Sequence, residues 1–349
     1  MCTQESPRPL RYKSVNTKRQ LFPFLNGLFV WAAVAWGNLR GRPMFTRFCR
    51  KAIIGVIGLA LTGVGYSPAL ASEYAGTKAM DFSKLAGSAK AESLGYALTA
   101  YSSLNGLEYN PAGIAQLDTP ELLLQTQAYV ESIQTQKVEL AWPLPLGVVG
   151  LSYHSVDFGS QARTTWLNRD GTGELFSAVG SSVLGAYALR MNDISGGVGV
   201  RYYQETLDNN RSTAWGMDVG LAADLAPDWR VGASVINIPL RASTHVSQSD
   251  TLAYTGRVGV YHRITVWDRP LGISTDVVWP SDDDMAVGIG LEYALLPMLN
   301  VRAGYTSEPD LYHWAFGVGM RIDRWQMDVA YVPMSFAMSA YKIGVGVML

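Results

Sequence analysis

The feature that most constrains the fold is an alternation of apolar with small or polar residues, which has a period of two and runs from residue 119 to residue 349 almost without interruption. In residues 314–322, for example, Trp314, Phe316 and Val318 alternate with alanine and glycine. Successive side chains of a β-strand point to opposite faces of the sheet, so each such run predicts a strand with one strongly apolar face.

Fourteen runs of this kind follow one another. They span residues 120–131, 136–143, 147–156, 181–190, 196–206, 213–225, 229–238, 252–264, 271–280, 285–296, 299–307, 312–322, 325–333 and 340–349. Most are about ten residues long, which is the length that a tilted strand needs to cross a bilayer. The count and the lengths predict an all-β fold: a 14-stranded antiparallel transmembrane β-barrel.

A soluble periplasmic β-sandwich that binds a ligand is the alternative, because its strands alternate in the same way with the apolar face inward. Connection lengths favour the barrel. Turns after even-numbered runs are short, as at residues 144–146 and 297–298, whereas residues 157–180 and 239–251 form long connections. Short turns on one side and long loops on the other are typical of outer-membrane barrels. Trp and Tyr near the ends of the runs also match an interfacial girdle.

The less apolar face of the runs carries small residues and few charges. Its five acids and five bases are Glu139, Arg201, Asp218, Arg257, Asp276, Glu292, Arg302, Arg321, Asp328 and Lys342. A balanced set predicts ion pairs inside a barrel lumen that is filled by a plug. It argues against a general ion pore, because selective pores align charges of one sign.

Charge also separates the beginning of the chain from the rest. Residues 1–71 carry ten basic residues and one acid, whereas residues 72–349 carry eighteen basic residues and twenty-eight acids. In residues 44–71, a basic start, an apolar run and a final Ala-Leu-Ala predict a secretory signal peptide cleaved after Ala71. We interpret residues 1–43 as an upstream extension that precedes the true start at Met44.

Residues 72–118 are not strand-like and form the predicted N-terminal plug, on the periplasmic side or in the lumen, before the barrel of residues 119–349. Leu94, Leu98 and Tyr101 have helical spacing and predict a short helix over residues 89–101. The turn motif that follows consists of Asn110, Pro111, Ala112 and Gly113, in which Pro fixes φ and Asn can bond the next backbone groups. Plug aromatic residues that could contact an apolar ligand, or simply pack the plug, are Phe82, Tyr96, Tyr101 and Tyr109.

Five short segments of the chain carry recognisable motifs: residues 93–100 (SLGYALTA), 109–115 (YNPAGIA), 232–237 (GASVIN), 300–305 (NVRAGY) and 328–333 (DVAYVP). Together they resemble the PorV/PorQ family. Members of that family typically carry Met-Gly-x-Ala-x-Thr-Ala followed by Trp-Asn-Pro-Ala-Gly-Leu. The family is itself similar to the long-chain fatty-acid transporter barrels, the FadL-like superfamily, so the resemblance implies a fourteen-stranded, plugged barrel in a Gram-negative outer membrane.

The chain departs from the family pattern at three positions. Leu94 replaces the usual Met, Tyr109 replaces Trp, and the chain ends in Leu349 rather than Phe. The last difference concerns recognition by the barrel-assembly machinery, which we expect to be a partner together with outer-membrane lipid.

Enzymatic readings find little support in the sequence. There is no Gly-x-Ser-x-Gly elbow, and Ser152 with His154 has no recognisable orienting partner, so we predict no catalytic residue and no enzyme. Three aspartates at 282–284 could hold Ca²⁺, but such a turn is usually solvated, and we predict no metal site and no cofactor. Both cysteines, Cys2 and Cys49, precede the cleavage site. The acidic mature chain argues against nucleic acid as a partner.

Two functional hypotheses remain open. The first is transport of a hydrophobic small molecule through the plugged lumen. The second follows from the family resemblance, since some PorV/PorQ members serve type IX secretion by receiving secreted cargo protein or attaching it at the surface. In that role, residues 157–180 and 239–251 would form the contact surface.

Overall fold

The computed structural model describes residues 78–85, 87–128, 133–242, 251–307, 313–333 and 339–349. The upstream extension of residues 1–43 and the signal peptide of residues 44–71 lie outside the described residues.

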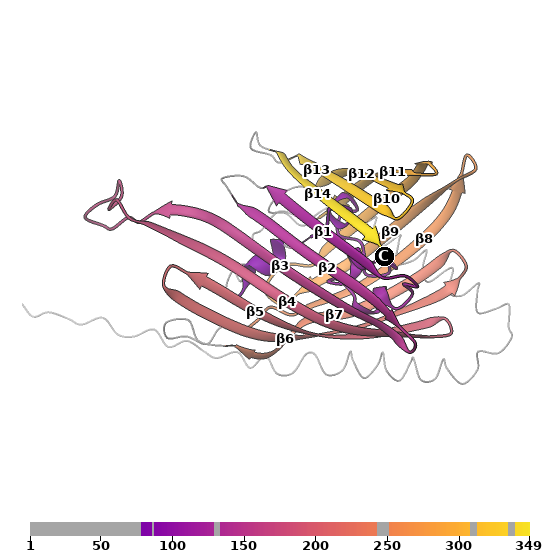
Figure 1. The fold of residues 1–349 in the computed structure, drawn as a ribbon, viewed down its shortest axis with the longest axis horizontal. Coiled ribbons are helices and arrows are strands. Elements are labelled where there is room, and N and C mark those ends of the chain that lie inside the picture. The colour runs from indigo at the N-terminus through magenta and orange to yellow at the C-terminus, as the bar shows by residue number, and fades with distance from the viewer. Residues whose placement is uncertain (1–77, 86, 129–132, 243–250, 308–312, 334–338) are drawn as a thin grey trace, which may run out of the picture. The chain divides into compact units, whose positions relative to one another are not determined.

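Fourteen antiparallel strands close into one barrel, in which β1 pairs with both β2 and β14 (Figure 1). The strands are β1 (Glu121–Ala128), β2 (Gln134–Leu144), β3 (Gly147–Ala162), β4 (Leu175–Met191), β5 (Ile194–Leu207), β6 (Asn210–Ala226), β7 (Trp229–Ala242), β8 (Thr255–Val266), β9 (Arg269–Pro280), β10 (Ala286–Leu296), β11 (Leu299–Thr306), β12 (Trp314–Ile322), β13 (Trp325–Pro333) and β14 (Ser339–Met348). The predicted number, direction and order of the strands are confirmed, and a two-sheet sandwich is excluded.

Alternation along each strand separates the lumen from the outer surface. On β12, Trp314, Phe316 and Val318 are exposed on the outside, whereas Ala315 between them is buried. An outward apolar face is stable only in contact with lipid or a comparable apolar surface, as in transmembrane barrels. Among the described residues, no helix is long and apolar enough to cross a membrane.

The two ends of the barrel differ. At the end where β1 begins and β14 finishes, each even-numbered strand from β2 to β12 passes to the next through two residues, as at residues 145–146 and 323–324. We name this the turn end and the opposite one the loop end. The asymmetry in connection length that the sequence predicts is therefore present.

The predicted long connections are wrong in extent. β3 continues to Ala162 and β4 begins at Leu175, so the connection at 157–180 shrinks to residues 163–174. β7 likewise runs to Ala242, into the predicted connection at 239–251. Both faces of a strand can be polar where it leaves lipid, so the period-two signal fades although backbone pairing continues. A register shift after Asp157 further disturbs the pattern.

The described residues before β1, which we call the plug, contain only short helices. These are η2 (Asp81–Leu85), α3 (Ala89–Ser93), η3 (Leu104–Gly106) and η4 (Pro111–Ile114). The predicted helix over residues 89–101 is wrong beyond Ser93. Gly95 and Tyr96 both have φ near +60°, a left-handed conformation that ends a helix.

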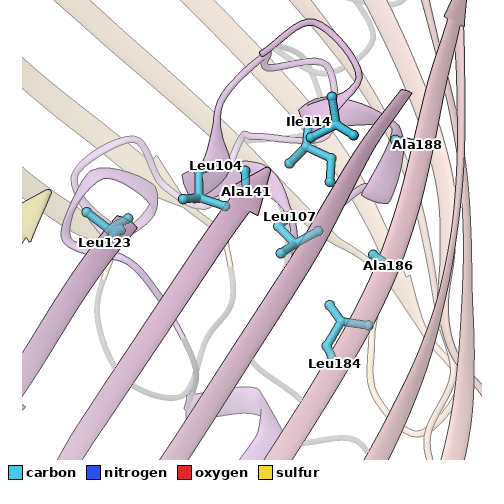
Figure 2. Close-up of a cluster of buried hydrophobic side chains, with 9 residues drawn as sticks. Leu104, Leu107, Ile114, Leu123, Ala141, Leu184, Ala186 and Ala188 are labelled. Carbon is cyan, nitrogen blue, oxygen red and sulfur yellow. The ribbon is translucent and has the colours of Figure 1, made fainter. Parts of the chain in front are cut away.

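Two apolar clusters hold the plug in the lumen. Near the turn end, Leu104, Leu107 and Ile114 of the plug pack against small and aliphatic side chains of β1 to β4 (Figure 2). Near the loop end, Met80 and Phe82 pack into a second cluster with side chains of β3, β5, β6 and the β7–β8 connection. Each buried large side chain contributes about 1.5–3 kcal/mol, so the plug belongs to the hydrophobic core of the protein.

Between these clusters, the plug backbone lies directly against lumen glycines. A Cβ at Gly304 of β11 would overlap the backbone of Gly95, and one at Gly220 of β6 would overlap the side chain of Asn110. The glycines on the less apolar face therefore let the plug backbone approach the wall closely.

Candidate functional site

A charged layer fills the lumen between the two apolar clusters. Its central group joins the plug to β2, β5 and β6. Glu108, which lies between η3 and η4, pairs with Lys137 of β2 at 2.8 Å and with Arg201 of β5 at 3.2 Å. Lys137 also pairs with Glu139 at 2.9 Å, and Arg201 with Asp218 of β6 at 2.9 Å. All five side chains are nearly inaccessible to solvent, so each charge depends on its partners.

Glu108 is the member of this group that belongs to the plug. Burial by itself would raise the pKa of the Glu108 carboxyl, but the charges of Lys137 and Arg201 outweigh burial and hold that pKa below its usual value. A lowered pKa means that the ionised carboxylate stabilises the folded protein.

We expect this contribution to be complete above the unfolded-state pKa of about 4.3 and to be lost as the pH falls through the lower folded-state pKa. In acid unfolding of the protein in detergent micelles, Glu108→Gln should therefore show a shallower loss of stability below about pH 4.3 than the parent protein. Glu174→Gln is the control, because Glu174 is largely exposed in its pair with Arg163 and should leave the acid slope unchanged. An unaltered slope in Glu108→Gln would contradict the assignment.

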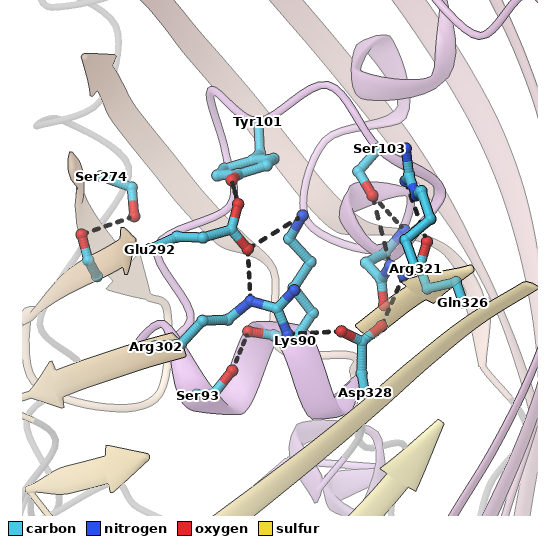
Figure 3. A network of polar contacts seen from close by, with 12 residues as sticks. Lys90, Ser93, Tyr101, Ser103, Ser274, Glu292, Arg302, Arg321, Gln326 and Asp328 are labelled. Atoms are coloured by element: carbon cyan, nitrogen blue, oxygen red, sulfur yellow. Dashed lines mark hydrogen bonds and ion pairs between the residues drawn. The ribbon is translucent and has the colours of Figure 1, made fainter. Parts of the chain in front are cut away.

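A second polar network ties α3 to the strands on the other side of the barrel (Figure 3). Glu292 of β10 pairs with Arg302 of β11 and lies 3.7 Å from Lys90 of α3. The Tyr101 hydroxyl donates to Glu292, and Arg302 pairs with Asp328 of β13 at 2.6 Å. Ion pairs between side chains thus hold the plug to two opposite parts of the barrel wall.

Two further contacts complete the layer. The backbone N–H and hydroxyl of Thr99 both donate to Asp276 of β9, which also pairs with Arg257 of β8 at 3.1 Å. Lys342 of β14 lies 3.6 Å from Glu92 of α3 and donates to a plug carbonyl.

The ten charges that the sequence places on the less apolar face occupy the lumen side of the wall in this way. Eight are buried and ion-paired: Glu139, Arg201, Asp218, Arg257, Asp276, Arg302, Asp328 and Lys342. Glu292 is half-buried in its pairs, and Arg321 is exposed near the turn end with Gln326 at 3.4 Å.

The four plug aromatic residues all pack against other side chains. Phe82 meets the ring of Tyr203 edge-on, and Tyr101 meets Tyr261 in the same manner. Tyr96 lies beside Tyr109, over whose ring the Arg257 guanidinium sits at 4.9 Å. These contacts hold the plug in place in the described conformation, so a ligand would reach the rings only after a rearrangement.

The Asn-Pro-Ala-Gly turn joins the plug to the wall. Asn110 is the N-cap of η4, and its side-chain oxygen accepts from the N–H of Ala112 at 3.0 Å. Its amide nitrogen donates to the carbonyls of Thr99 at 2.7 Å and Leu221 of β6 at 3.0 Å. Pro111 occupies the first helical position, where its missing N–H costs nothing. One fully buried side chain therefore links η4, the plug turn at Thr99 and the barrel.

We expect Asn110→Asp to destabilise the protein by about 3 kcal/mol, because a carboxylate cannot donate to the two carbonyls and would place a buried negative charge against them. Chemical unfolding in micelles measures the loss. Asn105→Asp is the matched control: Asn105 is also buried in the plug, but the hydrogen bond described for its amide nitrogen goes to the Ser103 hydroxyl, which can reverse its role and donate. Equal losses in the two variants would refute this role of Asn110.

Sequence reasoning missed four charges of this layer: Lys137, Lys90, Glu92 and Glu108. Lys137 lies two residues before Glu139 and shares its lumen face, so the period-two alternation was sufficient to predict that Lys137 faces the lumen. The three plug residues lie outside any strand, and only the folded arrangement brings them to their partners.

Two other sequence candidates have clear positions. Ser152 and His154 share the lumen face of β3, but Ser152 donates to Glu108 at 3.0 Å and not to the histidine. Of the three aspartates in the β9–β10 connection, Asp282 is buried and pairs with Lys84 of η2 at 2.7 Å, so it is not the solvated residue that the turn suggests. Within the described ranges, no group of three or more His, Cys, Asp or Glu could hold a metal ion.

Comparison by sequence finds no matching family model and no matching curated protein. Solved structures with a similar fold do exist. The toluene transporter TbuX of Ralstonia pickettii has a TM-score of 0.53 and 13% identity over 74% of this chain and 96% of its own. The toluene transporter TodX of Pseudomonas putida has a TM-score of 0.53 and 12% identity, and the match covers 74% of this chain and 96% of TodX. A FadL homologue of Pseudomonas aeruginosa has a TM-score of 0.54 and 10% identity, and the match covers 75% of this chain and 98% of the homologue. This chain therefore shares its fold with these three barrels.

Proposed function

We propose that this protein lies in the outer membrane of a Gram-negative bacterium and transports a hydrophobic small molecule through its plugged lumen. The observation that carries the proposal is the combination of a closed fourteen-stranded barrel with an internal plug, in a fold shared with barrels that are described as toluene transporters. A cleaved signal peptide over residues 44–71 would deliver it, and no catalytic chemistry is required.

The arrangement of charge in the lumen supports a gated path for the solute rather than an open ion pore. Acids and bases of the lumen neutralise one another in ion pairs, for example Arg201 with Asp218 and Arg302 with Asp328. Selective ion pores instead present one sign of charge to the passing ion. An apolar solute that crosses this lumen must displace part of the plug, and we propose that the plug acts as the gate.

The second candidate is a PorV/PorQ-type accessory of type IX secretion that binds cargo protein at the cell surface. One observation favours it. The β3–β4 hairpin carries Trp166 and Leu167, each nearly 90% exposed, on a connection held by backbone hydrogen bonds of Arg163 with Thr172 and Glu174. Exposed aromatic and aliphatic side chains on a preorganised loop are typical anchors of protein interfaces.

Uptake of labelled toluene separates the two candidates. The protein is produced in a Gram-negative host that lacks a hydrocarbon channel, with the empty vector as control, and a hydrophilic antibiotic of similar size as a second solute. We expect toluene uptake to rise several-fold and antibiotic uptake to stay unchanged.

No rise in toluene uptake at verified surface levels, or an equal rise for both solutes, would contradict the transport proposal. Mass spectrometry of the purified barrel adds an independent readout, in which a co-purified apolar molecule supports transport. A captured secreted protein in place of an apolar molecule supports the second candidate.

A further inference from the structure

His154 is a buried titratable side chain that neither apolar transport nor plug packing uses. It lies on the lumen face of β3, is 2% exposed, and has Lys137 of β2 and Ser182 of β4 as its cross-strand neighbours. Neither ring nitrogen has a hydrogen-bond partner among the described residues. A buried polar group without a partner is uncommon in folded proteins and calls for a physical explanation.

The surroundings of His154 are unusually rich in fixed charge. We define the central charged layer as the three cations and four carboxylates that the ion pairs join here: Lys137 and Glu139 of β2, Arg201 of β5, Asp218 of β6, Lys342 of β14, and Glu92 and Glu108 of the plug. The charges that act most strongly on the His154 ring are those of Glu108, Lys137, Lys342 and Arg201.

Every carboxylate of this layer already has a cation. Glu108 holds Lys137 and Arg201, Glu139 holds Lys137, Asp218 holds Arg201, and Glu92 lies near Lys342. A fourth cation at His154 would face Lys137 across the β2–β3 pair, where each carboxylate of the layer is already ion-paired. It would compete with Lys137 and Arg201 for Glu108, which is the plug's own member of the layer.

We propose that His154 is a proton-sensitive element of the plug contact, and that protonation of its ring loosens the ion pairs by which Glu108 holds the plug to β2 and β5. Histidine ordinarily changes charge between about pH 5 and 8, whereas the ordinary ranges of Lys, Arg and carboxylates lie outside that window. In the loosened plug, where water reaches the ring, His154 would titrate in this ordinary range, so mild acidification would favour the loosened state. The inference concerns the plug contact and does not depend on which solute or partner the barrel serves.

A single cysteine reports on the plug. Ser93 of α3 is fully buried, and Ser93→Cys changes its size very little. The natural cysteines, Cys2 and Cys49, lie before residue 72, and the parent protein without a new cysteine measures any labelling that they contribute. Thr164→Cys, on the exposed β3–β4 connection, corrects for the effect of pH on thiol reactivity.

Thiol labelling of the full chain in detergent micelles is compared at pH 7.5 and pH 5.0. We expect the corrected rate at Ser93→Cys to rise about tenfold at the lower pH, equivalent to about 1.4 kcal/mol. Adding His154→Gln should remove most of this rise, and adding Glu108→Gln should do the same. Adding His262→Gln should leave it intact, because His262 stacks on Trp229 on the outer face near the turn end.

A corrected rate that does not change with pH would overturn the proposal, as would an undiminished rise in His154→Gln. Heat-modifiable migration on gels identifies variants that have folded. If His154→Gln does not fold, His154→Phe supplies the same comparison with a ring that cannot bind a proton.

Discussion

Arg201→Met should lower the free energy of unfolding by about 3–5 kcal/mol, the loss expected when one partner of a buried ion pair is removed. Arg201 is the only described cation paired with Asp218, and it shares Glu108 with Lys137. Methionine fills much of the same space but leaves the Asp218 carboxylate in the lumen with only the N–H of Asn237 as a partner among the contacts described. Reversible chemical unfolding in micelles or lipid vesicles measures the difference.

Arg190→Met is the matched control. Arg190 of β4 also pairs with an aspartate, Asp224, at 3.0 Å, but its side chain is exposed. Exposed pairs contribute at most about 1 kcal/mol, so this variant should stay near the parent protein. The double variant Arg201→Met with Asp218→Asn should recover part of the loss, because it removes the unpaired charge. If Arg201→Met and Arg190→Met have equal effects, the lumen pairs do not stabilise the barrel as we infer.

The second large effect is expected at Gly95, where the plug crosses β10 and β11. Gly95 has φ of +60°, and a Cβ there would overlap the carbonyl of Tyr305. Gly95→Ala therefore combines a left-handed alanine, which costs about 1–2 kcal/mol, with overpacking against backbone, which costs about 1–3 kcal/mol more. We expect a total loss of about 3 kcal/mol and faster proteolysis of the plug.

Gly173→Ala isolates the conformational part of this loss. Gly173 also has positive φ, +86°, but a Cβ there would meet nothing within 4 Å. Its substitution should cost only about 1–2 kcal/mol. A similar loss in both variants would show that the close approach between plug and wall has no energetic importance.

Much of the barrel could be predicted from the sequence, because lipid outside and a polar lumen inside impose opposite demands on neighbouring residues of every strand. The alternation from Trp314 to Ile322 results from that difference between the two faces. The period-two pattern no longer predicts a strand where the strand leaves the lipid. Beyond the lipid-facing zone, Ser160 and Gln161 belong to β3 although neither face there needs to be apolar.

The plug was less predictable because its conformation is set by the wall. Leu94 and Leu98 have helical spacing, yet both are buried in one cluster without a continuous helix, since the chain turns at Gly95 to follow the lumen glycines. For the charged layer, the alternation identifies the wall residues, but not their partners. Glu108 meets Arg201 across 93 positions of sequence, a separation that no local pattern encodes.

The path of the plug has a consequence for how the protein is built. Lys78 and Ala79 contact Thr251 and Leu252 at the loop end, whereas the plug reaches β1 at the turn end, where Leu349 also lies. The chain therefore runs the full height of the barrel before the first strand starts. The seam between β1 and β14 lies at the point where the plug enters the wall, and Leu349 donates a backbone hydrogen bond to Pro120 there. The plug, the first strand and the last strand are therefore joined at one place, so a change in any of them reaches the other two directly.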